Sequence, residues 1–82
     1  MKPVTKSVHT RNYARFLELL IKARKDAKVT QKEVAEKLNR PQSFVSKYEN
    51  GERRVDVIEF LEIAEAIGFD PGKFVSKIQK SR

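Results

Sequence analysis

Apolar residues recur along this chain at the spacing of α-helices, and no stretch alternates between apolar and polar residues as a strand does. The longest periodic stretch begins near Thr10 or Arg11 and ends at Ala27. The positions i, i+3, i+4, i+7, i+11 and i+14 are held by Tyr13, Phe16, Leu17, Leu20, Arg24 and Ala27. With Leu19 and Ile21 on its flanks, this stretch predicts one amphipathic helix with a wide apolar face.

Two short helices with a break between them are predicted next. Thr30 and Glu33 have the spacing of a capping box, in which the two side chains satisfy free N–H groups at the start of a helix. Asn39 tolerates the left-handed conformation that ends a helix, and Pro41 suits the first turn of the next one. The predicted helices span 31–38, with Val34, Ala35 and Leu38 inward, and 42–48, with Val45 and Tyr48 inward.

Two more helices complete the pattern. Asp56 and Glu59 form a second capping box, and Gly68 is a typical stop, so a helix is expected between them. Its inward residues are predicted to be Val57, Phe60, Leu61, Ala64 and Ile67. Asp70 and Pro71 then open a last helix that carries Phe74, Val75 and Ile78. The fold class expected is therefore all-α, a compact five-helix bundle.

The length of 82 residues fits one domain, which we place at residues 10–78 between a polar basic leader (1–9) and a short tail (79–82). The net charge of +7 is spread unevenly. Residues 1–29 hold eight Lys or Arg against two acidic residues, whereas residues 55–82 hold four against five. This basic excess points to a polyanionic partner, either nucleic acid or an acidic membrane face.

The composition argues against several other classes of function. The chain has no cysteine, which suits a reducing cytoplasm, and its leader lacks the apolar core of a signal peptide. No stretch approaches the roughly 18 apolar residues of a membrane span. The single His9 and the scattered carboxylates form no metal cluster and no nucleophile–base pair. We therefore expect no enzyme, no cofactor and no membrane contact, and a cytoplasmic location at the nucleoid.

The two short helices are the feature that points to a function. Helices of this length are marginal alone and must be held together by packing, which the small Ala35 permits at their crossing. The outer face of the second helix is polar and basic and carries Gln42, Ser43, Ser46 and Lys47. Such a helix fits the major groove of DNA, with its N-terminal residues nearest the base edges.

Three segments at these positions resemble the Cro/CI-type helix-turn-helix family of XRE-like regulators. They are TQKEVAEKL (30–38) and QSFVSKYENG (42–51), which contain the two helices of the motif at 31–48, and FLEIAEAIG (60–68) in the following helix. With the first helix, the resemblance covers roughly residues 12–74 and implies a lambda-repressor-like domain. It implies a regulator, most often a repressor, that binds a two-fold operator in double-stranded DNA.

The resemblance also implies roles for individual residues. It assigns base reading to Gln42, Ser43 and Lys47, with Phe44 beside them. Phe44 either contacts a thymine methyl or packs over the turn. Contacts with the phosphate backbone are implied for Gln31, Lys32, Arg40, Arg53 and Arg54. Arg24 and Glu49 match a structural ion pair of the family. The leader is either a frayed tail or a further contact with the DNA backbone.

Some positions depart from the family pattern. Pro41 replaces a capping hydroxyl, Lys28 and Asn39 replace glycines that end helices, and Val55 replaces a frequent proline. Pro41 removes a side-chain contact that the family commonly makes. Lys28 costs about 1 kcal/mol if the left-handed geometry is kept.

A homodimer is expected because a two-fold operator needs two recognition helices about one turn of DNA apart. Phe69, Phe74, Val75 and Ile78 exceed what a terminal helix needs to cap the core, so we place a self-complementary patch at Phe74, Val75 and Ile78. Leu19 or Ile21 is expected to extend it. The alternative function is an antitoxin or adaptor that uses the same fold to bind a partner protein.

Overall fold

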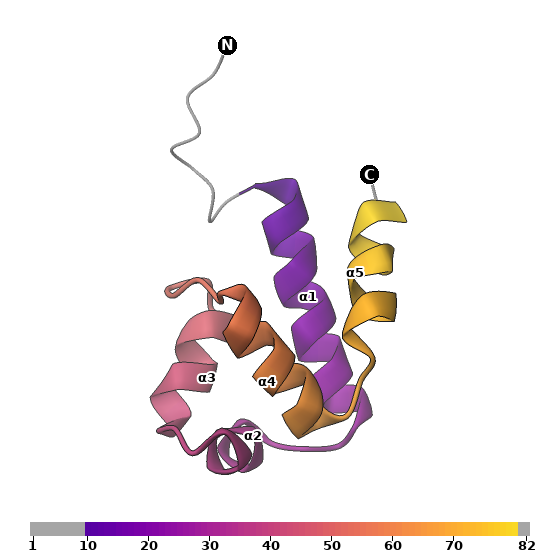
Figure 1. Cartoon of the computed structure of the whole chain (residues 1–82). Coiled ribbons are helices and arrows are strands. Elements are labelled where there is room, and N and C mark those ends of the chain that lie inside the picture. Colours follow the sequence, from indigo (N-terminus) through magenta and orange to yellow (C-terminus); the bar gives the residue numbers. More distant parts are fainter. Residues whose placement is uncertain (1–9, 81–82) are drawn as a thin grey trace.

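The structure is a computed structural model that describes residues 10–80, and the regular structure within this range is entirely helical. The helices are α1 (Arg11–Asp26), α2 (Gln31–Leu38), α3 (Gln42–Glu49), α4 (Val57–Ile67) and α5 (Pro71–Lys80). Figure 1 shows α1 and α5 side by side, with α2 and α3 packed against each other in the lower part of the view. The predicted all-α five-helix fold is confirmed.

The helix boundaries follow the capping residues that the sequence predicted. Thr30 and Asp56 each accept a hydrogen bond from the residue three positions on, in complete capping boxes. Gly68 ends α4 in the left-handed conformation. α5 continues to Lys80, two residues beyond the expected end of the domain, because Gln79 and Lys80 favour helix. The expectations for the leader concern residues outside the described range.

One hydrophobic core joins the five helices. Its fully buried side chains are Leu20, Val34, Val45, Tyr48 and Ile63. Phe16, Phe60, Phe69 and Phe74 extend it toward α5, with ring centroids 4.8 to 5.8 Å apart. Phe74 is therefore part of the core of one chain, which corrects the expectation that it belongs to a dimer patch. Leu19, placed on the flank of the first helix, is buried as well.

The inward face of α4 differs from the one expected. Val57 is 72% exposed and Leu61 46% exposed, whereas Ile63 is completely buried. Apolar residues occur on nearly every side of α4, so the pattern of the sequence did not define a single inward face. Packing against the rest of the core selects Phe60, Ile63 and Ala64.

The turn between α1 and α2 contains a strained residue. Lys28 has a φ of 61°, the left-handed conformation expected if it took the place of a glycine. The backbone N–H of Val29 nevertheless donates to Arg24 O at 3.3 Å, which completes the end of the helix. A side chain in this conformation costs about 1 kcal/mol, and the surrounding packing holds it.

Candidate nucleic-acid interface

The α2–α3 unit is built by local signals at each of its ends. Thr30 Oγ1 accepts the N–H of Glu33 at 3.0 Å, and Glu33 Oε1 accepts the N–H of Thr30 at 2.8 Å. Asn39 ends α2 with a φ of 58°, and the N–H of Arg40 donates to Ala35 O at 2.9 Å. Pro41 precedes α3 without a side-chain cap. The sharp turn that results sets the direction of α3 relative to α2.

A chain of polar contacts fixes both ends of α3. At its end, Arg24 Nε and Nη2 donate to the two carboxylate oxygens of Glu49 at 2.7 and 3.1 Å. Gln31 Nε2 donates to Glu49 Oε1 at 2.9 Å, and Gln42 Nε2 donates to Gln31 Oε1 at 3.4 Å. The network therefore runs from α1 through the end of α3 and the start of α2 to the first residue of α3.

The ion pair within this network is almost fully covered by the protein. The side chains of Arg24 and Glu49 are 12% and 5% exposed. The hydrogen bond to Glu49 raises the pKa of Arg24, so the guanidinium remains charged at every physiological pH. The structural ion pair that the resemblance implied is present. The network also engages Gln31, whose phosphate contact remains a prediction.

The outer face of α3 presents the predicted base-reading residues together. Gln42, Ser43 and Lys47 are exposed; Ser43 and Lys47, four residues apart, share one side of α3, and Gln42 is its first residue. Ser46 is half-buried, and its hydroxyl donates to the carbonyl oxygen of Ser43 at 3.3 Å. This face is polar, basic and free of large apolar side chains. Its amide and ammonium groups can donate to base edges in a major groove.

Phe44 does not share this outward face. Its ring is only 7% exposed and lies edge-on against Tyr48, with centroids 5.4 Å apart. Of the two expectations for Phe44, its burial favours packing over the turn and corrects its placement among the base readers. It also forms the surface on which the guanidiniums of Arg40 and Arg53 lie, at 4.4 and 4.8 Å from the ring centroid.

The predicted backbone-contacting cations lie around α3. Arg40 is in the turn before it, and Arg53 and Arg54 are in the loop after it. The guanidinium of Arg54 lies over the ring of Tyr13, 4.1 Å from its centroid. Lys32 is exposed in the first turn of α2. The structure therefore places Arg40 and Arg53 against Phe44 of α3, whereas Arg54 lies against α1 and Lys32 on the first turn of α2.

Sequence reasoning missed the second role of Glu59. Arg53 Nη1 and Nη2 donate to its two carboxylate oxygens at 2.9 and 2.8 Å, and Arg40 approaches at 3.6 Å. The hydrogen bonds from Arg53 hold the pKa of Glu59 below its ordinary value. Its place in a capping box was visible in the sequence. The approach of two arginines from different loops required the fold.

Tyr48 lies at the centre of the domain, beneath α3. Its side chain is fully buried, and within residues 10–80 its hydroxyl has no hydrogen-bond partner. Burial raises the pKa of Tyr48 well above its ordinary value, so the phenol stays neutral. The group therefore supports packing under α3.

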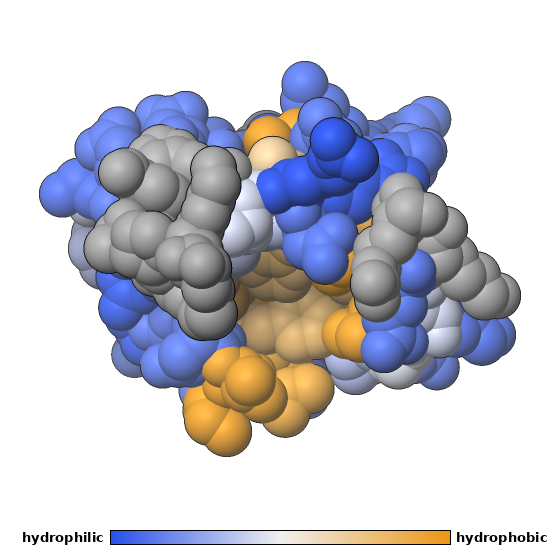
Figure 2. Space-filling view, turned by 90° about the horizontal axis from the view of Figure 1, so that it is seen from above, coloured by the Kyte–Doolittle hydropathy of each residue, from blue (hydrophilic) through white to orange (hydrophobic). Residues whose placement is uncertain are grey.

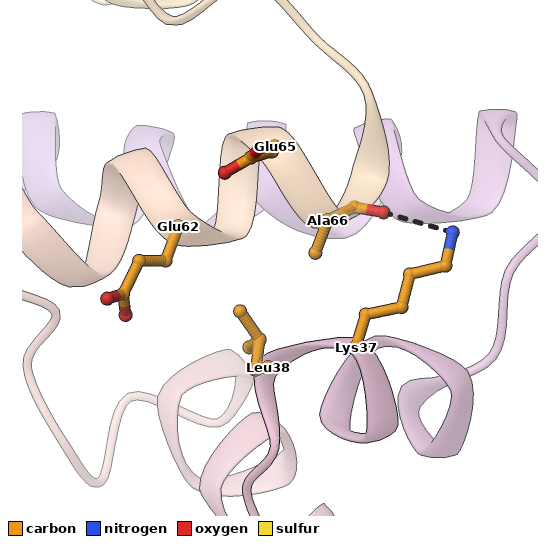
Figure 3. Close-up of a pocket in the computed structure, with 5 residues that line it drawn as sticks. All are labelled: Lys37, Leu38, Glu62, Glu65 and Ala66. Atoms are coloured by element: carbon orange, nitrogen blue, oxygen red, sulfur yellow. Dashed lines mark hydrogen bonds between the residues drawn. The ribbon is translucent and has the colours of Figure 1, made fainter.

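The pocket between α2 and α4 lies apart from the predicted contacts. Figure 3 shows the residues that line it, Lys37, Leu38, Glu62, Glu65 and Ala66. The pocket has a volume of about 380 Å³. Lys37 Nζ donates to the carbonyl oxygen of Ala66 at 3.4 Å, close to the end of α4. This contact joins the two helices and satisfies a carbonyl of the last turn. None of the predicted DNA-contacting residues lines the pocket.

No group of three or more His, Cys, Asp or Glu within residues 10–80 is arranged to hold a metal ion. In the same range, none of the helices has the length and apolar character needed to cross a membrane.

A capped helix, a turn of three residues and a second helix with an exposed polar face together define a helix-turn-helix DNA-binding domain. The helix-turn-helix family model matches residues 20–74. Among solved structures, the "XRE-family like protein from Pseudomonas syringae pv. tomato str. DC3000" is 50% identical, with 98% of each chain covered and a TM-score of 0.88. No curated relative matches. The chain belongs to the XRE family of helix-turn-helix DNA-binding regulators.

Proposed function

We propose that this protein is a sequence-specific repressor that places α3 in the major groove of a two-fold operator and blocks a promoter by occupying it. The observation that carries the proposal is the exposed face of Gln42, Ser43 and Lys47 on a helix fixed at both ends. Gln pairs bidentately with adenine, and Lys reaches the acceptors of guanine. The Gln42 amide also donates to Gln31 Oε1 at 3.4 Å, a solvent-exposed contact at the start of α3.

Affinity in this proposal comes first from the phosphate backbone. Lys32, Arg40, Arg53 and Arg54 approach phosphates on either side of the groove, and Gln31 lies at the start of α2, where N–H groups favour anions. These contacts fix the register of α3 on the duplex and carry no sequence information themselves.

Selection of a binding site from random duplex DNA tests this function. The wild-type protein is expected to enrich a palindromic consensus and to bind it at least about 10³-fold more tightly than a scrambled duplex of the same length, as specific regulators do. Equal affinity for both duplexes would contradict base reading by α3. A chain that retained a protein from its own cells but enriched no DNA would support the antitoxin or adaptor alternative.

The surface for a second copy is proposed on α4 and α5. The large exposed apolar side chains within the described residues are Val57, Ile58, Leu61 and Val75. Val57 and Val75 also line a shallow hollow of about 270 Å³. Figure 2 shows apolar side chains gathered beside a hollow with an apolar floor. We therefore move the proposed dimer patch from Phe74 and Ile78 toward the start of α4, keeping Val75.

The double variant Val57→Lys/Ile58→Lys is expected to raise the dissociation constant of the dimer at least about tenfold, because charges enter an apolar interface. Sedimentation equilibrium measures this constant, and Ala27→Lys, an exposed residue at the end of α1, is the control. Binding to the palindromic duplex is expected to weaken in parallel, while a half-site duplex is bound as before. An unchanged dimer constant would exclude this patch.

A further inference from the structure

Two arginines converge on one buried carboxylate beside α3. Arg40 comes from the turn before α3 and Arg53 from the loop after it. Arg53 Nη2 and Arg40 Nη2 approach the same oxygen, Glu59 Oε2, at 2.8 and 3.6 Å. Both guanidiniums also lie over the ring of Phe44. The carboxylate and the ring together restrict where the two cations can point.

The carboxylate is covered, while the arginines remain open to solvent. Glu59 is buried, and its Oε1 also accepts the backbone N–H of Asp56 at 3.1 Å, the capping contact of α4. The side chains of Arg40 and Arg53 are 38% and 40% exposed. Two cations and one anion leave a net positive charge, and each guanidinium has five N–H donors, more than these contacts occupy.

We propose that Glu59 is a positioning residue that holds Arg40 and Arg53 as a clamp for one phosphate of the DNA backbone beside the first turn of α3. The inference rests on the proposed DNA-binding function and adds the residue that organises its backbone contact. Planar guanidiniums match phosphate oxygens in pairs. The clamp is assembled when the chain folds, so less side-chain freedom is lost when DNA binds.

If Glu59 played no positioning role, its removal would strengthen DNA binding, whereas removal of a positioning carboxylate weakens it. A carboxylate without this role repels the phosphates, so its removal would tighten binding to every duplex. A positioning carboxylate is needed for the clamp, so its removal weakens binding to the correct site. Glu59→Gln separates the two cases because glutamine keeps the capping contact with Asp56 and loses the charged fork to Arg53. The matched control is Glu33→Gln, the same change in the capping box of α2.

The test measures the affinity of the full chain for the selected duplex over a range of salt concentrations. Glu59→Gln is expected to weaken binding about tenfold, equivalent to about 1.4 kcal/mol. It is also expected to reduce the slope of log affinity against log salt by about 0.9 for each protomer, or about 1.8 for a dimer on the palindromic duplex, because each protomer loses one phosphate contact. Glu33→Gln leaves the slope unchanged. Arg53→Ala should reproduce the effect of Glu59→Gln, and the double variant should add little to either change.

Thermal unfolding of each variant shows whether it is folded, so that a change in affinity can be assigned to the altered contact. If Glu59→Gln does not fold, Arg40→Ala, Arg53→Ala and the variant that combines them provide the second measurement. If both arginines hold one phosphate, the combined variant is expected to lose less free energy of DNA binding than the sum of the two single variants. Tighter binding by Glu59→Gln, or independent effects of the two arginines, would overturn the clamp. The proposed function would still stand in that case, since its failure requires a wild-type chain that does not distinguish selected from scrambled DNA.

Discussion

Glu49→Ala is expected to destabilise the protein by about 3–5 kcal/mol, because it leaves the charge of Arg24 covered by protein and without its carboxylate. The same substitution removes the partner of Gln31 and frees the end of α3 from α1. Small domains have a total stability of about 5–15 kcal/mol, so this variant approaches the limit of folding. Urea unfolding followed by circular dichroism measures the difference in the free energy of unfolding between the wild type and the variant.

Two further variants show whether the burial of this ion pair causes the loss of stability in Glu49→Ala. Glu18→Ala removes the partner of Arg15 from a pair in which the Glu18 side chain is 69% exposed, and is expected to cost less than about 1 kcal/mol. The double variant Arg24→Met/Glu49→Leu removes both charges and should lose less than Glu49→Ala alone. A loss below about 1 kcal/mol for Glu49→Ala would mean that this pair does not hold α3 in place.

The double variant Gln42→Ala/Lys47→Ala is expected to bind the selected duplex about 10²- to 10³-fold more weakly, since each good base contact contributes roughly 1–3 kcal/mol. Binding to scrambled DNA should fall far less, because only the charge of Lys47 contributes there. Fluorescence anisotropy with both duplexes measures the ratio of the two affinities, which is the quantity that base reading controls.

Lys32→Ala is the control for this loss of specificity. Lys32 is exposed at the start of α2 and is proposed to contact a phosphate. Lys32→Ala is therefore expected to lower the affinity for both duplexes by a similar factor. Measurements of affinity at 50 and 200 mM salt separate the contribution of the phosphate contacts from that of the base contacts, because phosphate contacts weaken with salt much more steeply. An equal loss on both duplexes for Gln42→Ala/Lys47→Ala would show that α3 does not read sequence.

Most helix boundaries could be predicted because their causes are local. The hydroxyl or carboxylate that begins α2 or α4 lies three residues from the group it bonds, and Asn39 and Gly68 end their helices through their own backbone conformations. The pair of Arg24 and Glu49 is a long-range contact, and only the resemblance to a family pointed to it. The structure then supplied its geometry.

The errors concern residues whose surroundings come from distant parts of the chain. The apolar pattern of α4 allowed several inward faces, and packing chose the one that exposes Val57. The sequence of the last helix does not show that Phe74 meets Phe16, Phe60 and Phe69. Phe44 follows two polar residues, Gln42 and Ser43, in the sequence but is buried in the structure. Glu59 meets Arg40 only when the turn before α3 folds back toward α4.

The network that fixes α3 has a consequence for how duplicated copies of such a gene diverge. Ser43 and Lys47 are exposed on the face of α3, so, under the proposed function, we expect substitutions at these two positions to alter operator preference while the thermal stability of the protein is preserved. Gln42 is joined through Gln31 to Glu49, so change there disturbs contacts that also support folding. We therefore expect related copies of this domain with different operators to differ at residues 43 and 47 before they differ at residue 42.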